Sequence, residues 1–348
     1  MSEEKIKENQ ILILTNNKSL QEVEKWGQLC HQEGISFICS DAFGLWGYIF
    51  ADFGNEYVIQ DNGDEKIEGI IEYLIRVNEN TFLVKLSNKD FNWNDLIEIE
   101  QVKGIEGMNG KIFKIIEIKS LGSYMIQCDQ NLQGEYISGG ICTRYKTPIK
   151  KSYSSISEIQ SFTPEKLHQK VIEGDFLSYS ENLNNIAIFQ SILTFLQKND
   201  GEFPRRHQEE LIQDFLNISQ EYHKKYQLNA DLKHLRKIIC QARGDLNCIS
   251  SFLGGILAQE AIKAQTKKYY PLDQFLFYDS VRQCIPSELD LKEYEEEGTR
   301  YDGQIAVFGK TLQKKILNSK YLLVGAGAIG KKSFFFFFFL FFFSKLKK

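Results

Sequence analysis

Three glycines near the end of the chain have the spacing of a phosphate-binding loop. Gly325, Gly327 and Gly330 form Gly-x-Gly-x-x-Gly directly after the apolar run 321–324. In such a loop the first glycine allows a tight turn, the second lets the backbone approach a phosphate, and the third permits close helix packing. Backbone N–H groups and the helix dipole would then hold the anion. The spacing alone fits NAD, FAD or ATP, and it also fits a glycine-rich turn without a ligand.

The sequence after Gly330 does not supply the helix that this loop requires. Residues 334–343 are ten consecutive apolar residues, too few for the roughly 20 that cross a bilayer. Phe and Lys are encoded by triplets of T alone and of A alone, so this stretch has the composition of translated AT-rich non-coding sequence. We therefore interpret residues 331–348 as a gene-model artefact and leave them out of the fold.

Other chemically active side chains are scattered. The seven cysteines include no Cys-x-x-Cys pair, and no zinc-ligand spacing is present. This pattern predicts free thiols in a reducing compartment, the cytoplasm or the nucleus. Cys128 and Cys142 are expected to be packed strand residues, and His31 and His207 to be surface or capping groups. The sequence therefore predicts no catalytic residue and no metal site in this chain.

Net charge argues against nucleic acid as a partner, and hydropathy argues against a membrane. A net charge of -4 and a pI near 5.9 offer no basic field for nucleic acid. The first ten residues are charged and lack the apolar segment of a secretory signal, and no segment is long enough to predict a membrane anchor. Four basic residues are expected to be solvated: Arg205, Arg206, Lys267 and Lys268. The three tryptophans are expected in the core: Trp26, Trp46 and Trp93.

The elements that would position a site begin with an α/β unit. Ile11–Thr15 and Ile35–Ser40 have the pattern of short buried strands. Between them Ser19 and Glu22 have capping-box spacing, and Gly34 stands where a helix C-cap belongs. One face of this helix is apolar: Leu20, Val23, Trp26 and Cys30. This is half of a nucleotide-type fold without a glycine loop of its own.

Two changes of periodicity follow. Side chains alternate with period two over residues 112–119, and 108–111 contains the Asn-Gly signal of a tight hairpin. Helical periodicity returns from residue 152 to about residue 243. Two apolar stripes mark it: Ile186, Phe189, Ile192 and Leu193, then Leu211, Ile212, Phe215 and Leu216. We expect a small separate β-domain followed by a bundle of three or four helices.

The α/β pattern then resumes. Residues 244–265 predict a helix whose small residues would let another element approach closely: Gly254, Gly255, Ala258 and Ala261. A strand is expected at 274–279, so the β-domain and the bundle are predicted insertions in one interrupted α/β domain. The acidic residues 293–298 predict a surface linker. A short helical piece from residue 300 and a strand at 321–325 would open a second α/β domain.

Arg300–Gly330 resembles the opening of the active adenylation domain of the eukaryotic ubiquitin-activating enzymes. Leu29–Gly54, Gly244–Ala264 and Phe275–Pro286 are similar to parts of the inactive adenylation domain of that family. The two intervening segments resemble its first catalytic-cysteine half-domain and its four-helix bundle. The resemblance covers about residues 10–330 in order, which is far more specific than a glycine loop.

This resemblance implies a fold and a division of the chain. The fold is α/β, a Rossmann-type adenylation fold of the ThiF/MoeB kind, with an inserted small β-barrel-like domain and an inserted helical bundle. The implied segments are 1–54 and 244–293 for the inactive adenylation domain, 55–150 for the half-domain, 151–243 for the bundle and 294–330 for the start of the active adenylation domain.

The resemblance also implies a reaction. Members of the family use ATP, with Mg²⁺, to adenylate the C-terminus of ubiquitin, and then form a thioester on an enzyme cysteine before transfer to ubiquitin-conjugating enzymes. Gly325, Gly327, Ala328 and Gly330 correspond to the ATP-contacting loop. The family's remaining ligands, its thioester cysteine and its docking domain for conjugating enzymes correspond to sequence beyond Gly330. The 348-residue chain alone is therefore expected to be inactive.

One departure and two alternatives accompany this interpretation. Related homodimeric enzymes have Arg-Tyr-Ser-Arg-Gln where this chain has Arg300–Gln304, so Gly303 replaces an arginine that reaches the partner's ATP site. Glycine supplies no charge, which fits a partner half without a working site. The chain could instead be a noncatalytic ubiquitin-binding module, because the family's β-domain touches ubiquitin. A dinucleotide oxidoreductase is disfavoured, since that fold needs no two large insertions before its first glycine loop.

Overall fold

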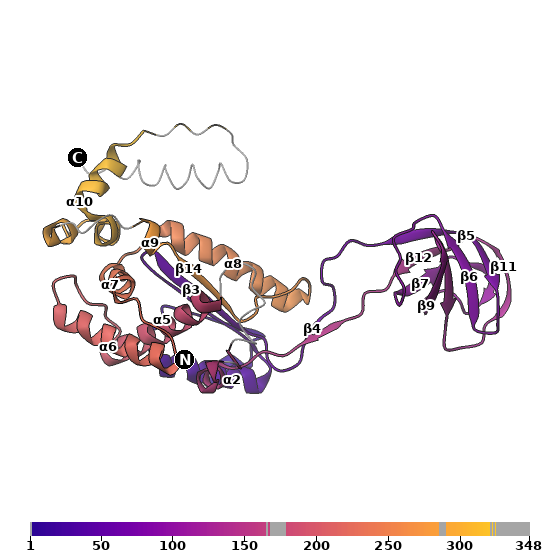
Figure 1. Ribbon diagram of the computed structural model, residues 1–348, viewed down its shortest axis with the longest axis horizontal. Helices are drawn as coiled ribbons and strands as arrows, with labels where there is room; N and C mark the ends of the chain where they lie inside the picture. The colour runs from indigo at the N-terminus through magenta and orange to yellow at the C-terminus, as the bar shows by residue number, and fades with distance from the viewer. Residues whose placement is uncertain are drawn as a thin grey trace.

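The computed structural model describes residues 2–164, 166–167, 179–284, 290–320, 322 and 324. Figure 1 shows a larger body, in which helices cover a sheet, and a small barrel that extended chain holds away from it. The helix α10 (Asp302–Asn318) lies at the end of the body opposite the barrel. Two separate hydrophobic cores correspond to these two parts.

The sheet of the body has the strand order β1-β2-β3-β14. Its strands are β1 (Ile11–Thr15), β2 (Ser36–Phe43), β3 (Trp46–Asp52) and β14 (Phe275–Asp279). Only β1 and β2 are parallel among these strands, since β3 pairs antiparallel with both β2 and β14. The α/β class is therefore confirmed, with a mixed sheet. β1 forms an edge and leaves Ile13 exposed, so the expectation that this strand is buried was wrong.

Helix α2 (Leu20–Glu33) follows from its local sequence. The Ser19 side chain accepts a hydrogen bond from the backbone N–H of Glu22, and Gly34 ends the helix in the left-handed region at φ 68°. The predicted apolar face is buried. The predicted capping box is only half formed, because the Glu22 carboxylate accepts from the indole N–H of Trp26.

The barrel is the predicted β-domain, and its six strands close in the order β10-β6-β5-β12-β7-β9. Their bounds are β5 (Glu68–Arg76), β6 (Thr81–Leu86), β7 (Leu96–Glu100), β9 (Lys111–Ser120), β10 (Ser123–Gln127) and β12 (Ile141–Arg144). The alternation over 112–119 is confirmed in part: Phe113 and Ile115 are fully buried, and Ile112, Ile116 and Ile118 are exposed.

The Asn-Gly signal does not form the predicted tight hairpin. β9 pairs with β7, and β8 (Lys103–Glu106) lies between them in the chain and pairs with β11 (Gln133–Ser138). The Asn109 amide instead accepts from the N–H of Val102 and donates to its carbonyl, which closes a longer connection. The turn itself is present, since the N–H of Lys111 donates to the carbonyl of Met108 at 3.2 Å, but the strands on its two sides pair with other strands.

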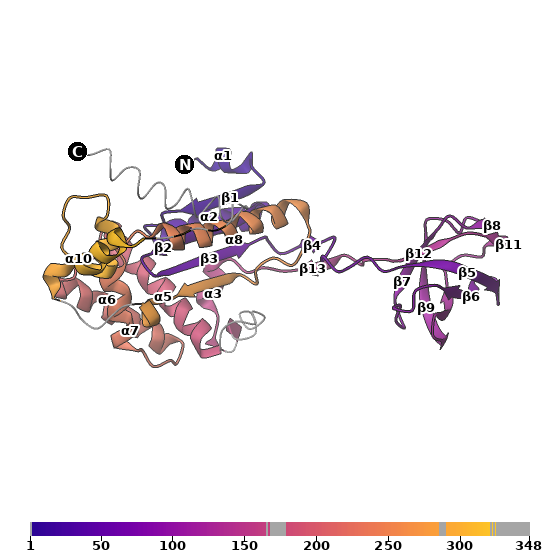
Figure 2. The same ribbon diagram turned by 90° about the horizontal axis from the view of Figure 1, so that it is seen from above.

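Two short strands carry the chain to and from the barrel. They are β4 (Tyr57–Ile59) and β13 (Ile149–Lys151), which pair antiparallel (Figures 1 and 2). At the body end, the backbone N–H of Gln60 donates to the carbonyl of Lys267, and Lys267 lies over the ring of Tyr57 at 4.2 Å. Lys267 is therefore packed against an aromatic ring and not simply solvated.

The predicted helical segment packs directly on the sheet. Its helices include α3 (Ile156–Ser161), α5 (Tyr179–Lys198), α6 (Glu209–Lys225) and α7 (Leu232–Gln241). The rings of Tyr48 in β3 and Phe189 in α5 are 4.6 Å apart, and the Trp46 indole N–H donates to the side chain of Asn185. Figure 1 shows α5 and α6 on one side of the sheet and α8 (Asn247–Thr266) on the other. The body thus has one continuous core.

Part of the surface of helix α8 is uncovered, although its small residues predicted the close approach of another element. A Cβ placed on Gly254 or Gly255 would meet nothing within 4 Å among the described residues. Phe252 and Ile262 on the same helix are exposed. The remaining elements are α1 (Glu3–Lys7), α9 (Val281–Cys284), the 3₁₀ helix η1 (Leu291–Tyr294) and α10 (Asp302–Asn318). None of the helices in the described part has both the length and the hydropathy to span a bilayer.

Candidate functional site

The four residues predicted to bind a nucleotide lie outside the described part of the chain: Gly325, Gly327, Ala328 and Gly330. Most of the strand predicted at 321–325 does too. Leu322 and Val324 are described, belong to no strand and are almost fully exposed. What the structure does describe is the support immediately before the loop, which consists of η1, the linker 295–301 and α10.

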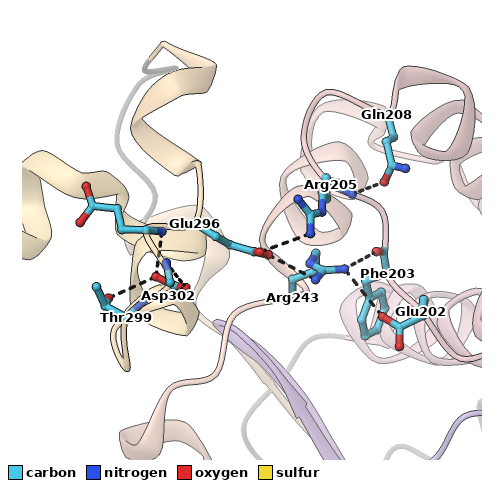
Figure 3. A network of polar contacts seen from close by, with 10 residues as sticks. Glu202, Phe203, Arg205, Gln208, Arg243, Glu296, Thr299 and Asp302 are labelled. Carbon is cyan, nitrogen blue, oxygen red and sulfur yellow. Dashed lines mark hydrogen bonds and ion pairs between the residues drawn. The ribbon is translucent and has the colours of Figure 1, made fainter.

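Asp302 organises the start of α10. Its carboxylate accepts hydrogen bonds from the backbone N–H groups of Glu297, Gly298 and Thr299 at 3.0–3.2 Å, and from the Thr299 hydroxyl (Figure 3). Burial works to raise the pKa of Asp302, but these donors outweigh it and lower that pKa. The linker is therefore folded back onto the first turn of the helix.

Two glycines let α10 approach the end of α7. A Cβ on Gly303 would lie 3.0 Å from both the Cβ and the backbone nitrogen of Asp245. A Cβ on Gly244 would lie 2.2 Å from Cγ2 of Val307. A side chain at position 303 would therefore require the backbone of Asp245 to shift.

Helix α10 is broken in the middle by Gly309. The backbone there has φ 79° and ψ 162°, a conformation essentially restricted to glycine. The break divides the element into a first half, 302–308, and a second half, 310–318. Beyond the break, the N–H of Thr311 donates to the Glu293 carboxylate at 2.8 Å, and this hydrogen bond lowers the pKa of Glu293.

An ion-pair network joins the linker to the bundle. Glu296 accepts from Arg205 and from Arg243, each at 3.3 Å, and Figure 3 shows its carboxylate between the two guanidinium groups. Arg243 also donates to the carbonyl of Phe203 and lies 3.7 Å from Glu202. These groups are partly exposed, so each pair contributes only about 0–1 kcal/mol.

Arg206 differs from its neighbour Arg205 and from the solvated group that was predicted. Its guanidinium carbon lies 3.6 Å from the centre of the Tyr294 ring, and one of its amino groups donates to the carbonyl of Ala306 in α10. Burial lowers the pKa of Arg206. Tyr294 is itself buried, so the predicted surface linker contains an anchored aromatic side chain. The residues that follow it, 295–298, are exposed, as predicted.

Two histidine–aspartate pairs, one buried and one partly buried, were missed by sequence reasoning. His31 Nδ1 lies 2.9 Å from Asp52, and His234 Nε2 lies 2.6 Å from Asp279. Burial raises the pKa of Asp52. Each pair joins a helix to a strand, α2 to β3 and α7 to β14, so His31 is a core residue and not a surface or capping group. His207 is exposed, as predicted.

The buried cysteines among the described residues are poor nucleophiles. Burial raises the pKa of both Cys30 and Cys142 to about 12, and that of Cys39 well above its usual value. Cys128 is buried too, which confirms the packed assignment of Cys128 and Cys142. Within the described ranges, His, Cys, Asp and Glu side chains form no group of three or more that could hold a metal ion.

Of the three tryptophans, two follow the prediction. Trp26 and Trp46 are buried, but Trp93 is 63% exposed. The Trp93 indole N–H donates to the carbonyl of Ile116, which holds the ring against the outside of β9. The strand carbonyl thus provides a hydrogen-bond acceptor for the one polar group of the indole ring.

Comparison with known proteins places these features in context. No family model matches the chain. "Ubiquitin-like modifier-activating enzyme 1" of Rattus norvegicus is 33% identical over 333 residues, which is 92% of this chain and 30% of that protein. "Ubiquitin-activating enzyme E1 1" of Candida albicans is 33% identical over 91% of this chain, and the Dictyostelium discoideum relative is 34% identical over 95% of it. The chain spans about 30% of the length of these curated relatives.

Proposed function

Because the chain corresponds over about 92% of its length to a segment of the ubiquitin-activating enzymes, we propose that it is part of the apparatus that activates ubiquitin. The reaction would be ATP-dependent adenylation of the ubiquitin C-terminus, followed by thioester formation on an enzyme cysteine. The observation that carries the proposal is the similarity over nearly the whole chain, barrel and helical segment included. The same similarity argues against a dinucleotide oxidoreductase.

Capture of ATP is assigned to the glycine loop. Gly325, Gly327, Ala328 and Gly330 would offer backbone N–H groups to the phosphates. Helix α10 lies close before this loop in the sequence, since only six residues separate Asn318 from Gly325. Bound ATP supplies the leaving group, pyrophosphate, for attack by the ubiquitin carboxylate. Mg²⁺ would accompany the nucleotide, and the described residues include no group of three or more side chains suited to hold it.

Burial argues against three of the described cysteines as the thioester nucleophile, whereas Cys248 is exposed and stands in no catalytic-cysteine context of the family it resembles. Cys30, Cys39 and Cys142 are held as thiols by burial, whereas a thioester requires a thiolate that the substrate can reach. We therefore propose that the 348-residue chain does not complete the reaction alone. Ubiquitin-conjugating enzymes would be partners of the complete enzyme, in the cytoplasm and the nucleus.

The test is exchange of labelled pyrophosphate into ATP in the presence of ubiquitin. The 348-residue chain is expected to show no ubiquitin-dependent exchange above a sample without ubiquitin. Robust exchange would contradict the proposal that the chain does not act alone. Denaturing gels without reductant, run after incubation with ATP and ubiquitin, should show no thioester band.

A noncatalytic ubiquitin-binding role is the second candidate, and the outer face of the barrel favours it. Ile75 pairs directly with Leu83, and Leu83 pairs directly with Met125 on the next strand, so an apolar stripe crosses β5, β6 and β10. Ile75 is 53% exposed, and Leu83 and Met125 are half-buried. A contiguous exposed apolar patch is typical of an interaction site.

Titration of isotope-labelled ubiquitin with the intact chain tests this second role by NMR. Saturable shifts that disappear in I75K, but persist in a variant of the uncovered helix α8 such as I262K, would support it. Shifts absent with the wild-type chain, or unchanged in I75K, would count against a site on this face.

A further inference from the structure

The break in α10 leaves two helix ends that require partners. The first half ends near Gly309, so its last carbonyls have no intrahelical donors, and the second half begins with N–H groups that have no intrahelical acceptors. Side chains from outside α10 meet one group at each end. Arg206 donates to the Ala306 carbonyl, and Glu293 accepts from the Thr311 N–H.

Charge reinforces both contacts. A cation is favourable at the negative C-terminal end of a helix and an anion at the positive N-terminal end. Arg206 and Glu293 occupy these two places. They are linked through Tyr294, which follows Glu293 in the chain and has its ring centre 3.6 Å from the Arg206 guanidinium carbon. One side chain of the inserted helical segment therefore holds both the linker and the broken helix.

Arg206 lies there without an ion pair to any carboxylate among the described residues. Its Nε is buried and has no hydrogen-bond partner. Burying a guanidinium without an ion pair costs free energy. The planar group of Arg206 offsets part of this cost, because it can stack on a ring and donate a hydrogen bond from its edge at the same time. Lysine has the charge but not the planar group, so it cannot make both contacts in the same way.

We propose that Arg206 is a positioning residue, which fixes the break in α10, the last described helix before the glycine loop in the sequence. The proposal rests on the proposed function for its link to ATP. The inserted helices would thereby be coupled to the nucleotide site, although Arg206 touches no nucleotide itself.

Hydrogen exchange of the intact chain tests the contact itself. R206A and R206K are compared with the wild type and with R236A, a matched control whose arginine pairs with Glu209 within the bundle. We expect exchange over residues 302–313 to be about tenfold faster in both Arg206 variants, which is the scale of losing a charged hydrogen bond and a cation–π contact. Exchange in the barrel should not change. Equal exchange over 302–313 in R206K and R236A would overturn the proposal.

ATP binding, measured on the same proteins with Mg²⁺ present, separates positioning from simple stabilisation. ATP affinity should fall at least about threefold in R206K while the melting temperature stays near that of R236A. Unchanged affinity would show that Arg206 is structural only. A wild-type chain that binds no ATP would contradict the proposed function and with it the nucleotide role of Arg206, and exchange would still decide whether Arg206 holds α10.

Discussion

Single side chains were predicted well where their neighbours in the chain decide the outcome, and poorly where distant residues do. The cap at Ser19 and the left-handed Gly34 depend on residues within one turn, and both were found. Arg206, His31 and Trp93 were each assigned from local context and each was wrong. Their partners are Tyr294, Asp52 and the carbonyl of Ile116, which are 88, 21 and 23 residues away in sequence. Local periodicity contains no signal for such contacts.

A residue-scale prediction concerns Asp41. Its carboxylate accepts from the N–H groups of Asn16 and Asn17, but burial is stronger and raises its pKa to about 6 from 3.8. The folded state therefore holds this proton more tightly than the unfolded state. The stability that Asp41 contributes is complete below about pH 4 and is lost as the pH rises through about 6, by about 3 kcal/mol at about 1.4 kcal/mol per pKa unit.

The D41N variant should lose this part of the pH dependence. Urea unfolding at several values between pH 4 and pH 7 measures it as the difference between the two proteins. The free energy of unfolding of the wild type should decline relative to that of D41N over this range. D129N, at an exposed barrel position, is the control that should follow the wild type. Parallel profiles for D41N and wild type would refute the assignment.

At the scale of elements, the glycines of α8 and α10 differ in whether their backbone conformation requires glycine. Gly254 and Gly255 have ordinary helical backbone and open space at the Cβ position, whereas Gly309 has a backbone conformation that other residues strongly disfavour. The sequence predicted close packing at the first two, and no described element makes it. It predicted one short helix where Gly309 divides α10, because a single glycine within a helical pattern does not reveal its φ angle.

Replacing Gly309 with alanine should lower the free energy of unfolding. The φ of 79° with ψ of 162° is a Gly-only conformation, and forcing it on alanine costs on the order of 1–3 kcal/mol. Chemical denaturation of G309A should show this loss, and hydrogen exchange should locate it in residues 302–318. A G309A protein as stable as the wild type would mean that α10 is not held in its broken form.

Replacing the two α8 glycines with alanine should stabilise the protein. Alanine favours the helix over glycine by about 0.5–1 kcal/mol per site, and nothing described lies within 4 Å of either new Cβ. G254A/G255A should therefore unfold at a higher urea concentration than the wild type. A lower midpoint would show that this face of α8 is covered in solution.

At the scale of the whole molecule, the order of segments was predictable and their assembly was not. Period-two and helical patterns located the barrel and the helical segment. The pairing of β14 with β3 joins Leu276 to Ile49, and no local pattern indicates it. The same applies to the packing of the helical segment into the core of the body. Long-range pairings of this kind are set by tertiary packing, which overrides local propensity.

The arrangement also gives the two insertions different relations to the proposed site. The barrel has its own core and is joined to the body through β4 and β13. The helical segment contacts α10 through Arg206, and it contacts the linker before α10 through Arg205 and Arg243. Figure 1 shows α10 at the end of the body remote from the barrel. Changes in the barrel should therefore affect ubiquitin contacts, and changes in the helical segment should affect the nucleotide.

Equilibrium binding of ATP to the intact chain, in competition with NADH, tests the central claim most directly. The account predicts saturable binding of ATP that is lost in G327V, because a side chain at the second glycine blocks approach of the backbone to the phosphates. It predicts no competition by NADH. Saturable binding of NADH, or ATP binding that G327V leaves unchanged, would contradict it.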